Sequence, residues 1–263
     1  MEIDPECVVF DLDGTLAESK ARIEDETAHL LALLLDKYQI VVISGGSFKQ
    51  FETQLISRLI PKNQIDTPAI TTSNIKLENL HLMPLSGSEL YEYKASVGKW
   101  ELIHSSVLSQ DEREKIIAAI HKALGDVDFA LVSKHYGERI EDRGAQITFS
   151  ALGQEAPIDL KKAWDPDKKK RLALATALAQ HLPDFEVHVG GSTSVDVTKR
   201  GINKASSLRE LCIRMGVKLK DILYIGDDLF PGGNDFIVKS LGIETKEVSG
   251  PEQTCGIMRE LLD

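Results

Sequence analysis

The sequence is poor in the features that mark secreted and membrane-spanning proteins. Its longest aliphatic cluster, Leu30–Leu35, is far too short to cross a bilayer. No basic, then apolar, then small-residue leader opens the chain. Only three cysteines occur, Cys7, Cys212 and Cys255, and none forms a Cys-x-x-Cys pair, so we expect small buried side chains in a reducing compartment. These absences predict a cytoplasmic protein without a membrane partner.

Positive charge is also scarce, since 31 lysines and arginines face 41 aspartates and glutamates, for a formal net charge of −10. This balance argues against nucleic acid or an anionic membrane as a partner. A small phosphorylated metabolite remains compatible with it if a metal ion and a few cations reverse the field locally. The run Lys168–Arg171 predicts a solvated helix face rather than a basic patch, because apolar residues resume at Leu172.

Several common catalytic patterns are missing as well. The seven histidines are scattered, without a His-x-x-x-His pair or a cysteine–histidine cluster, so a zinc site or a histidine-based triad has little support. Ser44 lacks the Gly-x-Ser-x-Gly surroundings of a hydrolase nucleophile. Gly45 and Gly46 lack the Gly-Lys-Ser/Thr ending of a nucleotide-binding loop.

Two carboxylates follow directly after the first apolar run of the chain. Cys7–Phe10 is short and rich in β-branched residues, which predicts a strand buried on both faces. Asp11 and Asp13 come next, before Gly14. Two acids at positions i and i+2 beyond a strand end can approach one cation, and the glycine lets the backbone turn closely over it. Taken alone, these residues also suit an ordinary strand-to-loop junction with acids facing water.

The alternation of strands and helices predicts a parallel sheet. A helix is expected over Arg22–Tyr38, and a second buried strand over Gln39–Ile43 ends at Ser44. Strand, helix and strand at this spacing form a right-handed unit with parallel strands. Asp11 and Ser44 should then lie on the same edge of the sheet, where open α/β sheets bind ligands.

The middle of the chain shows a different pattern. Residues 85–190 predict an inserted α+β cap, because their strands alternate polar and apolar residues, as in a sheet with one solvated face. Residues 1–84 and 191–263 predict a doubly wound α/β core. The other expected strands are Ala69–Thr72, Phe129–Ser133, Gln146–Leu152, Phe185–Val189, Thr193–Val197 and Ile222–Ile225, and the other expected helices are Phe48–Ile60, Asp111–Leu124, Asp167–Leu182, Asn203–Met215, Asp235–Leu241 and Gln253–Leu262.

Residues from four separate sites suit one chemical scheme. Asp11 and Asp13 end the first strand, Ser44 the second and Asp227 a later one, while Lys204 begins the helix before that later strand. A carboxylate nucleophile needs a cation that neutralises both itself and the incoming phosphoryl oxygens, and donors where the transition-state charge spreads. Asp11, the backbone carbonyl of Asp13 and Asp227 are candidate ligands of Mg²⁺. Ser44 and Lys204 are candidates for holding the phosphoryl group.

This arrangement resembles the haloacid dehalogenase superfamily of phosphotransferases over essentially the whole chain. The four motifs of that family are matched by Asp11–Thr15, Ile43–Gly45, Lys204, and Gly226–Asp228 with Asn234 and Asp235. The resemblance implies Asp11 as the nucleophile, Asp13 as the general acid/base and Lys204 as the charge-neutralising lysine.

The same resemblance implies roles for the neighbouring motif residues. Ser44 and Gly45 would bind phosphate, and Asn234 and Asp235 would support the site. Asp228 would be either a metal ligand or an acid behind the ligands, and the motifs leave this alternative open.

A closer resemblance, to the eukaryotic-type phosphomannomutases, is carried by two stretches. Gly226–Asp235 includes an unusual Pro-Gly-Gly before Asn-Asp, and Gly190–Val197 also matches that family. The resemblance implies that Ser194 and Asp196 reach the bound sugar phosphate from the cap side. By itself, Ser194 would also suit a strand hydroxyl on a solvated face.

One position departs from the phosphomannomutase pattern. That family places several arginines on the cap sheet to hold the substrate's distal phosphate, because planar guanidinium groups suit phosphate geometry. Arg143 matches one of them, Arg139 is shifted from the expected place, and Gln154 stands where another arginine is expected. Glutamine supplies no charge for a second phosphate. This loss weakens a mutase, which must hold a bisphosphate in either orientation, more than it weakens a phosphatase.

We therefore expect a Mg²⁺-dependent phosphatase that acts on a sugar phosphate or a similar phosphomonoester through an aspartyl-phosphate intermediate. Asp11 attacks, and Asp13 protonates the leaving oxygen and then activates water. The alternative is a phosphomannomutase, in which a second sugar oxygen replaces that water. A catalytically silent sugar-phosphate-binding protein is less favoured, since no nucleophile, acid or metal carboxylate is missing. The sequence leaves open a homodimer formed through the cap.

Overall fold

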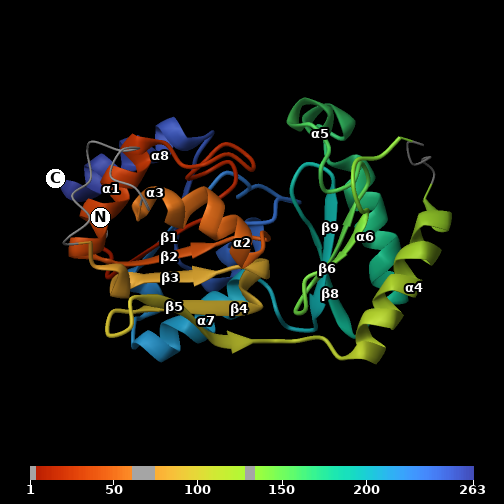
Figure 1. Cartoon of the computed structure of the whole chain (residues 1–263), viewed down its shortest axis with the longest axis horizontal. Coiled ribbons are helices and arrows are strands. Elements are labelled where there is room, and N and C mark those ends of the chain that lie inside the picture. The colour runs from red at the N-terminus through yellow and green to blue at the C-terminus, as the bar shows by residue number, and fades with distance from the viewer. Residues whose placement is uncertain (1–3, 61–74, 128–133) are drawn as a thin grey trace. The chain divides into compact units, whose positions relative to one another are not determined.

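The first apolar run of the sequence forms an interior strand of a large sheet (Figure 1). In the computed structural model, which describes residues 4–60, 75–127 and 134–263, this strand is β1 (Cys7–Phe10), and all four of its residues are buried. It pairs in parallel with β2 (Gln39–Ile43) on one side and β10 (Ile222–Gly226) on the other. The carboxyl ends of these three strands therefore share one sheet edge.

Four more strands complete a seven-stranded sheet of order β11-β10-β1-β2-β3-β4-β5. β3 (Leu80–Met83) pairs in parallel with β2, and β11 (Glu244–Glu247) pairs in parallel with β10. β4 (Glu89–Lys94) pairs antiparallel with β3, and β5 (Lys99–Ser105) lies next to β4. The sheet is thus mostly parallel, with its antiparallel pairing confined to one side.

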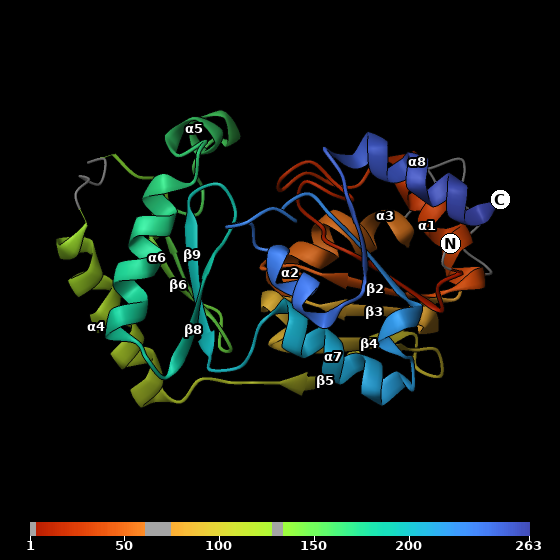
Figure 2. The same cartoon turned by 180° about the vertical axis from the view of Figure 1, so that it is seen from behind.

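Helices cover both faces of this sheet (Figures 1 and 2). Side chains alternate along β1, so Val8 and Phe10 pack with α1 (Asp25–Lys37) and α8 (Pro251–Leu262). The other two residues of β1 pack with α7 (Lys204–Met215) on the opposite face. This arrangement confirms the predicted doubly wound α/β core. The remaining helical segments are α2 (Phe48–Phe51), a π-helical turn η1 (Glu52–Ile56), α3 (Ser57–Leu59), and the 3₁₀ turns η3 (Leu77–Asn79), η4 (Leu85–Gly87), η5 (Leu219–Asp221) and η6 (Phe236–Leu241).

A second unit contains a four-stranded antiparallel sheet of order β6-β7-β9-β8 with helices on one face. Its elements are α4 (Gln110–Asp126), β6 (Ile140–Asp142), β7 (Ile147–Ser150), α5 (Ile158–Trp164), α6 (Lys169–His181), β8 (Phe185–Val189) and β9 (Ser194–Lys199). Ile147, Phe149, Val195 and Val197 form a core with α4 and α6. The residues between them along the strands therefore lie on the other, polar face of the sheet.

The division of the chain into these two units corrects the predicted boundaries. The first unit comprises Met1–His104, Lys204–Pro231 and Asp235–Asp263, and the second comprises Ser105–Asn203 and Gly232–Asn234. The predicted cap, residues 85–190, therefore begins before the start of the second unit at Ser105 and ends before Asn203. β4 and β5 extend the sheet of the first unit, and β9 pairs with β7 and β8 of the second.

Some expected elements fall elsewhere or are altered. The predicted strands Ala69–Thr72 and Phe129–Ser133 lie outside the described residues. The run Lys168–Arg171 is not wholly solvated, because Arg171 is buried in the second unit. Among the helices of the described residues, none combines the length and the hydropathy that a bilayer crossing requires.

Candidate active site

Three carboxylates meet at the carboxyl edge of the parallel sheet. Asp11 follows β1 and Asp227 follows β10, and the register that places Phe10 opposite Ile225 brings the two strand ends together. The N–H of Asp11 donates to the carbonyl of Ile225 at 3.0 Å. Carboxylate oxygens of Asp11, Asp227 and Asp235 lie within 4.8 Å of one another.

Lys204, the first residue of α7, is the cation of this cluster. Its Nζ donates to Asp11 Oδ1 at 2.5 Å and to Asp235 Oδ1 at 2.6 Å. Lys204 and Asp11 are each 3% exposed, and Asp235 is 0% exposed. Burial alone would lower the pKa of Lys204, but the two carboxylates more than offset this, so its pKa is raised and the ammonium stays charged.

Asp235 is held by further donors from the same region. The Tyr224 hydroxyl on β10 donates to Asp235 Oδ1 at 2.5 Å, and the N–H of Asp228 donates to Asp235 Oδ2 at 3.3 Å. Burial and the charge of Asp235 raise the pKa of the Tyr224 phenol, which keeps it a donor. Sequence reasoning missed Tyr224, because an aromatic residue in a buried strand is typical of a core; its position three residues before Asp227 was the available signal.

The cluster carries more negative than positive charge. Burial raises the pKa of Asp11 well above its ordinary value, although Lys204 opposes the shift. Burial, followed by the neighbouring charge of Asp228, raises the pKa of Asp227 to about 7, and the Thr15 hydroxyl donates to Asp227 Oδ1 at 3.2 Å. One ammonium thus faces two buried carboxylates and one half-buried carboxylate, an arrangement that a divalent cation would balance.

The donor set fits Mg²⁺, which binds oxygen ligands. Asp11 and Asp227 are the carboxylates with oxygens left to offer, whereas both oxygens of Asp235 already accept hydrogen bonds. The backbone also approaches Asp227 closely at Gly14, whose φ is +92°. A Cβ there would lie 2.4 Å from Asp227 Oδ2, so only glycine fits.

Asp13 lies apart from the three clustered carboxylates. Its Oδ1 accepts from the N–H of Lys20 at 2.6 Å and from Gln54 Nε2 at 3.0 Å. Gln54 is 2% exposed and also donates to the carbonyl of Ala21 at 2.8 Å. It lies in the π-helical turn η1, a feature often found at functional sites. A single glutamine on a helix carries no sequence signal, so this partner of Asp13 was missed.

The predicted phosphate-binding residues lie on the same sheet edge. Ser44 follows β2, which pairs in parallel with β1 so that Phe10 is opposite Val42. Ser44 is 4% exposed, and its Oγ accepts from the N–H of Gly46 at 3.3 Å. Gly45 lies between these two residues. Asn234 is grouped with the second unit.

The predicted cap residues lie in the second unit. Thr148 Oγ1 on β7 donates to Asp196 Oδ1 on β9 at 2.7 Å. Burial raises the pKa of Asp196, and the positive charge of Arg143 opposes that shift. Arg143 also forms an ion pair with Glu141 at 2.7 Å. Ser194 is two residues before Asp196 on β9 and therefore on the same face of the sheet.

Several phosphomannomutases are similar to this chain over nearly its whole length. The phosphomannomutase of Saccharomyces cerevisiae is 26% identical over 265 residues, which cover 97% of this chain and 94% of that protein. Phosphomannomutase 2 of Dictyostelium discoideum is 25% identical, covering 97% and 95%. The phosphomannomutase of Spinacia oleracea is 26% identical, covering 94% and 91%.

Solved structures share the fold at lower identity. The IMP-nucleotidase of Plasmodium falciparum superposes with a TM-score of 0.70 at 17% identity, covering 98% of this chain and 68% of that chain. A haloacid dehalogenase-like hydrolase from Bacteroides thetaiotaomicron gives a TM-score of 0.60 at 15% identity, covering 98% and 99%.

A family profile also matches the chain, and the matched span contains the candidate site. The profile of haloacid dehalogenase-like hydrolases matches residues 8–235, a span that begins in β1 and ends at Asp235. This span contains Asp11, Lys204, Asp227 and Asp235, the four charged residues that cluster at the sheet edge. The chain belongs to the haloacid dehalogenase-like hydrolase family.

Proposed function

We propose that the protein is a Mg²⁺-dependent phosphomannomutase, which moves a phosphoryl group between two oxygens of a hexose through an aspartyl phosphate on Asp11. The buried contact of Asp11 with Lys204 is the observation that carries the phosphoryl transfer. Sequence reasoning placed a phosphatase first. The relatives named phosphomannomutase, which match 94–97% of the chain, support the mutase instead.

The covalent step follows from the contacts of Asp11. One oxygen of the Asp11 carboxylate attacks a phosphorus of the hexose bisphosphate, while the Lys204 ammonium at Oδ1 neutralises part of the charge of the reacting groups. The bond from phosphorus to the sugar oxygen breaks, and protonated Asp13 gives its proton to that leaving oxygen. A Mg²⁺ ion held by Asp11 and Asp227 would neutralise the phosphoryl oxygens when bound.

The second step reverses the first at another oxygen. Asp13 takes the proton of the free hydroxyl of a hexose monophosphate, whose oxygen attacks the aspartyl phosphate; the bisphosphate forms again and the Asp11 carboxylate is released. The contacts of Asp13 with Lys20 and Gln54 hold its carboxylate apart from the clustered acids. This separation suits one carboxylate for nucleophilic attack and the other for proton transfer.

A phosphatase is the second candidate, and one residue favours it. Gln154 stands where the resemblance implies a cap arginine. Its neutral amide cannot supply the charge that holds the second phosphate of a hexose bisphosphate. Water would then replace the second sugar hydroxyl in the step that breaks down the aspartyl phosphate and releases inorganic phosphate.

One assay separates the two candidates. We would supply mannose 1-phosphate with a catalytic amount of hexose 1,6-bisphosphate and Mg²⁺, and measure isomerised sugar phosphate and released phosphate together. Isomerisation that outruns phosphate release is expected. Faster phosphate release would overturn the mutase and establish the phosphatase.

A near-isosteric variant tests the covalent route shared by both candidates. Asp11→Asn should abolish both products while the far-UV circular dichroism spectrum stays that of the unmodified protein. Asp36→Asn removes an exposed carboxylate of α1 and serves as the control. Full Mg²⁺-dependent activity in Asp11→Asn would rule out an aspartyl phosphate at this residue.

A further inference from the structure

The second unit contains a buried arginine that none of the family motifs explains. Arg171, the third residue of α6, is 5% exposed. Its Nε donates to Asp165 Oδ2 at 2.9 Å, and its Nη2 donates to the carbonyl of Asp165 at 2.8 Å. Its Nη1 donates to the carbonyls of Gly190 and Gly191, at 3.3 Å and 2.5 Å. One guanidinium therefore joins the start of α6 to the turn between β8 and β9.

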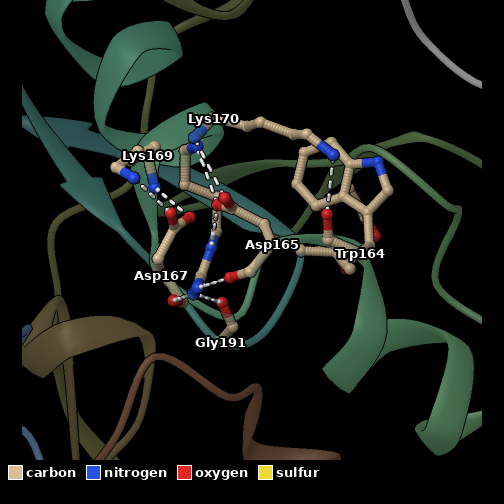
Figure 3. Close-up of polar contacts among 10 residues, drawn as sticks. Trp164, Asp165, Asp167, Lys169, Lys170 and Gly191 are labelled. Atoms are coloured by element: carbon tan, nitrogen blue, oxygen red, sulfur yellow. Dashed lines mark hydrogen bonds and ion pairs between the residues drawn. The ribbon is translucent and has the colours of Figure 1, made fainter.

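Asp165 anchors this guanidinium to the helix. Its two carboxylate oxygens accept from the N–H groups of Lys170 and Arg171, each at 3.0 Å. Figure 3 shows Asp165 and Gly191 within the same set of polar contacts, with Lys170 beside Trp164. Asp165 thus caps the first turn of α6 and fixes the arginine at the same time.

The turn held by Arg171 is also fixed from its other side. The N–H of Gly190 donates to the carbonyl of Ser194 at 2.9 Å, which closes the turn between β8 and β9. A Cβ on Gly190 would lie 2.6 Å from Asp196 Oδ2. The glycine therefore lets the carboxylate of Asp196 lie directly against the turn, so movement of the turn would also move its contacts with Asp196.

The two carbonyls that face Arg171 determine where the adjoining N–H groups point. In a trans peptide unit, the N–H points away from the carbonyl of the preceding residue, and the described residues contain no cis peptide. The N–H groups of Gly191 and Ser192 consequently point away from the guanidinium. Within the described part of the chain, no group accepts a hydrogen bond from either of them.

A buried charged pair is a poor way to stabilise a fold, because desolvation offsets much of its attraction. A planar guanidinium can, however, hold several acceptors in one fixed geometry. We propose that Arg171, anchored by Asp165, is a positioning residue that fixes the turn at Gly190 and Gly191 for recognition of the sugar. This inference rests on the proposed function, since it assigns the turn to the hexose phosphate of that reaction.

The groups at the turn suit a sugar hydroxyl better than a phosphate. A hydroxyl can donate to the Asp196 carboxylate while it accepts from the N–H of Gly191 or Ser192. A phosphate oxygen would be repelled by Asp196. The turn therefore selects for the hydroxyl pattern of the sugar. Arg171 supports this selectivity by positioning the turn, without contacting the substrate.

Kinetics of a conservative variant test this role. Arg171→Lys keeps the positive charge but cannot hold Asp165 and two carbonyls together. We expect its KM for mannose 1-phosphate to rise about tenfold with kcat changed by less than about twofold. Its kcat/KM for p-nitrophenyl phosphate, which has no sugar hydroxyls, should stay within about twofold of the original value. Lys169→Met, which removes an exposed ion pair with Asp167, is the matched control and should change neither substrate.

Hydrogen–deuterium exchange tests the positioning itself, independently of any reaction. The peptide that contains the Gly190 N–H should exchange faster in Arg171→Lys than in the original protein or in Lys169→Met. Unchanged exchange and an unchanged KM would each overturn the inference, as would an equal loss of activity on both substrates. A protein that hydrolyses p-nitrophenyl phosphate but acts on no hexose phosphate would refute the proposed function and its sugar ligand, while the exchange comparison would still decide the positioning role.

Discussion

Replacement of Lys204 by methionine removes the single ammonium that joins two buried carboxylates. Methionine has a similar length, so the main change is the loss of charge and of the contacts to Asp11 and Asp235 at 2.5 and 2.6 Å. Both carboxylates are at most 3% exposed, so water cannot take over the role of the ammonium. Two uncompensated acids would then face each other in the protein interior.

The size of the effect follows from this burial. Removal of one partner from a buried ion pair costs about 3–5 kcal/mol, because the other charge is left desolvated. For a chain of this length, 1 kcal/mol lowers the Tm by about 2–4 °C. We therefore expect Lys204→Met to lower the Tm by roughly 6–20 °C in the presence of EDTA at pH 8.

The loss should depend on pH in a defined direction. Without Lys204, the pKa of Asp11 rises further above the unfolded value of about 3.9. A carboxyl with a raised folded pKa contributes stability that is fully present below the unfolded pKa and is lost as the pH rises through the folded pKa. The difference in Tm between variant and original protein should therefore be smaller at pH 5 than at pH 8.

Thermal unfolding followed by circular dichroism measures this difference. Lys218→Met, which removes an exposed lysine after α7, is the matched control and should leave the Tm nearly unchanged at both pH values. A Tm of Lys204→Met within about 2 °C of the original at pH 8 would refute the buried charge cluster. A decrease in Tm that is larger at pH 5 than at pH 8 would refute the predicted direction of the pH dependence.

Three further predictions concern the same cluster. Gly14→Ala should weaken Mg²⁺-dependent activity at least about tenfold, because the new Cβ would collide with Asp227, whereas Gly216→Ala, with φ +75° and open space around it, carries similar backbone strain without that effect. Mg²⁺ affinity, measured by titration between pH 5.5 and 8.5, should rise with pH to about 7 and then level off, since a proton competes with the ion for Asp227; a flat profile would contradict its raised pKa. Tyr224→Phe should lower the free energy of unfolding by about 1–3 kcal/mol, measured by urea denaturation, because Asp235 loses a buried donor; an unchanged stability would contradict that contact.

Local patterns made part of the fold predictable from the sequence. The apolar runs β1 and β2 and the alternating segment β8 begin and end at the expected residues. Residues 89–105 fall within the predicted cap, residues 85–190, and the sequence predicts no strand among them, but they form β4 and β5. Their place in the first sheet depends on pairing with β3, a contact between segments that the local pattern does not report.

The candidate site was likewise predictable from the sequence only in part. Asp11 and Asp227 could be brought together from sequence alone, since both follow buried strands of one parallel sheet and so share its carboxyl edge. Tyr224 and Gln54 could not, because each acts through a hydrogen bond that only the tertiary packing creates. Arg171 was expected to be solvated with its lysine neighbours; its burial depends on carbonyls some twenty residues later in the chain.

A crystal grown with Mn²⁺ in place of Mg²⁺ tests the central claim most directly, because anomalous scattering identifies the ion. We predict a single ion that lies within about 2.3 Å of a carboxylate oxygen of Asp11 and also of a carboxylate oxygen of Asp227. An ion bound elsewhere, or one that contacts only one of these two acids, would contradict it.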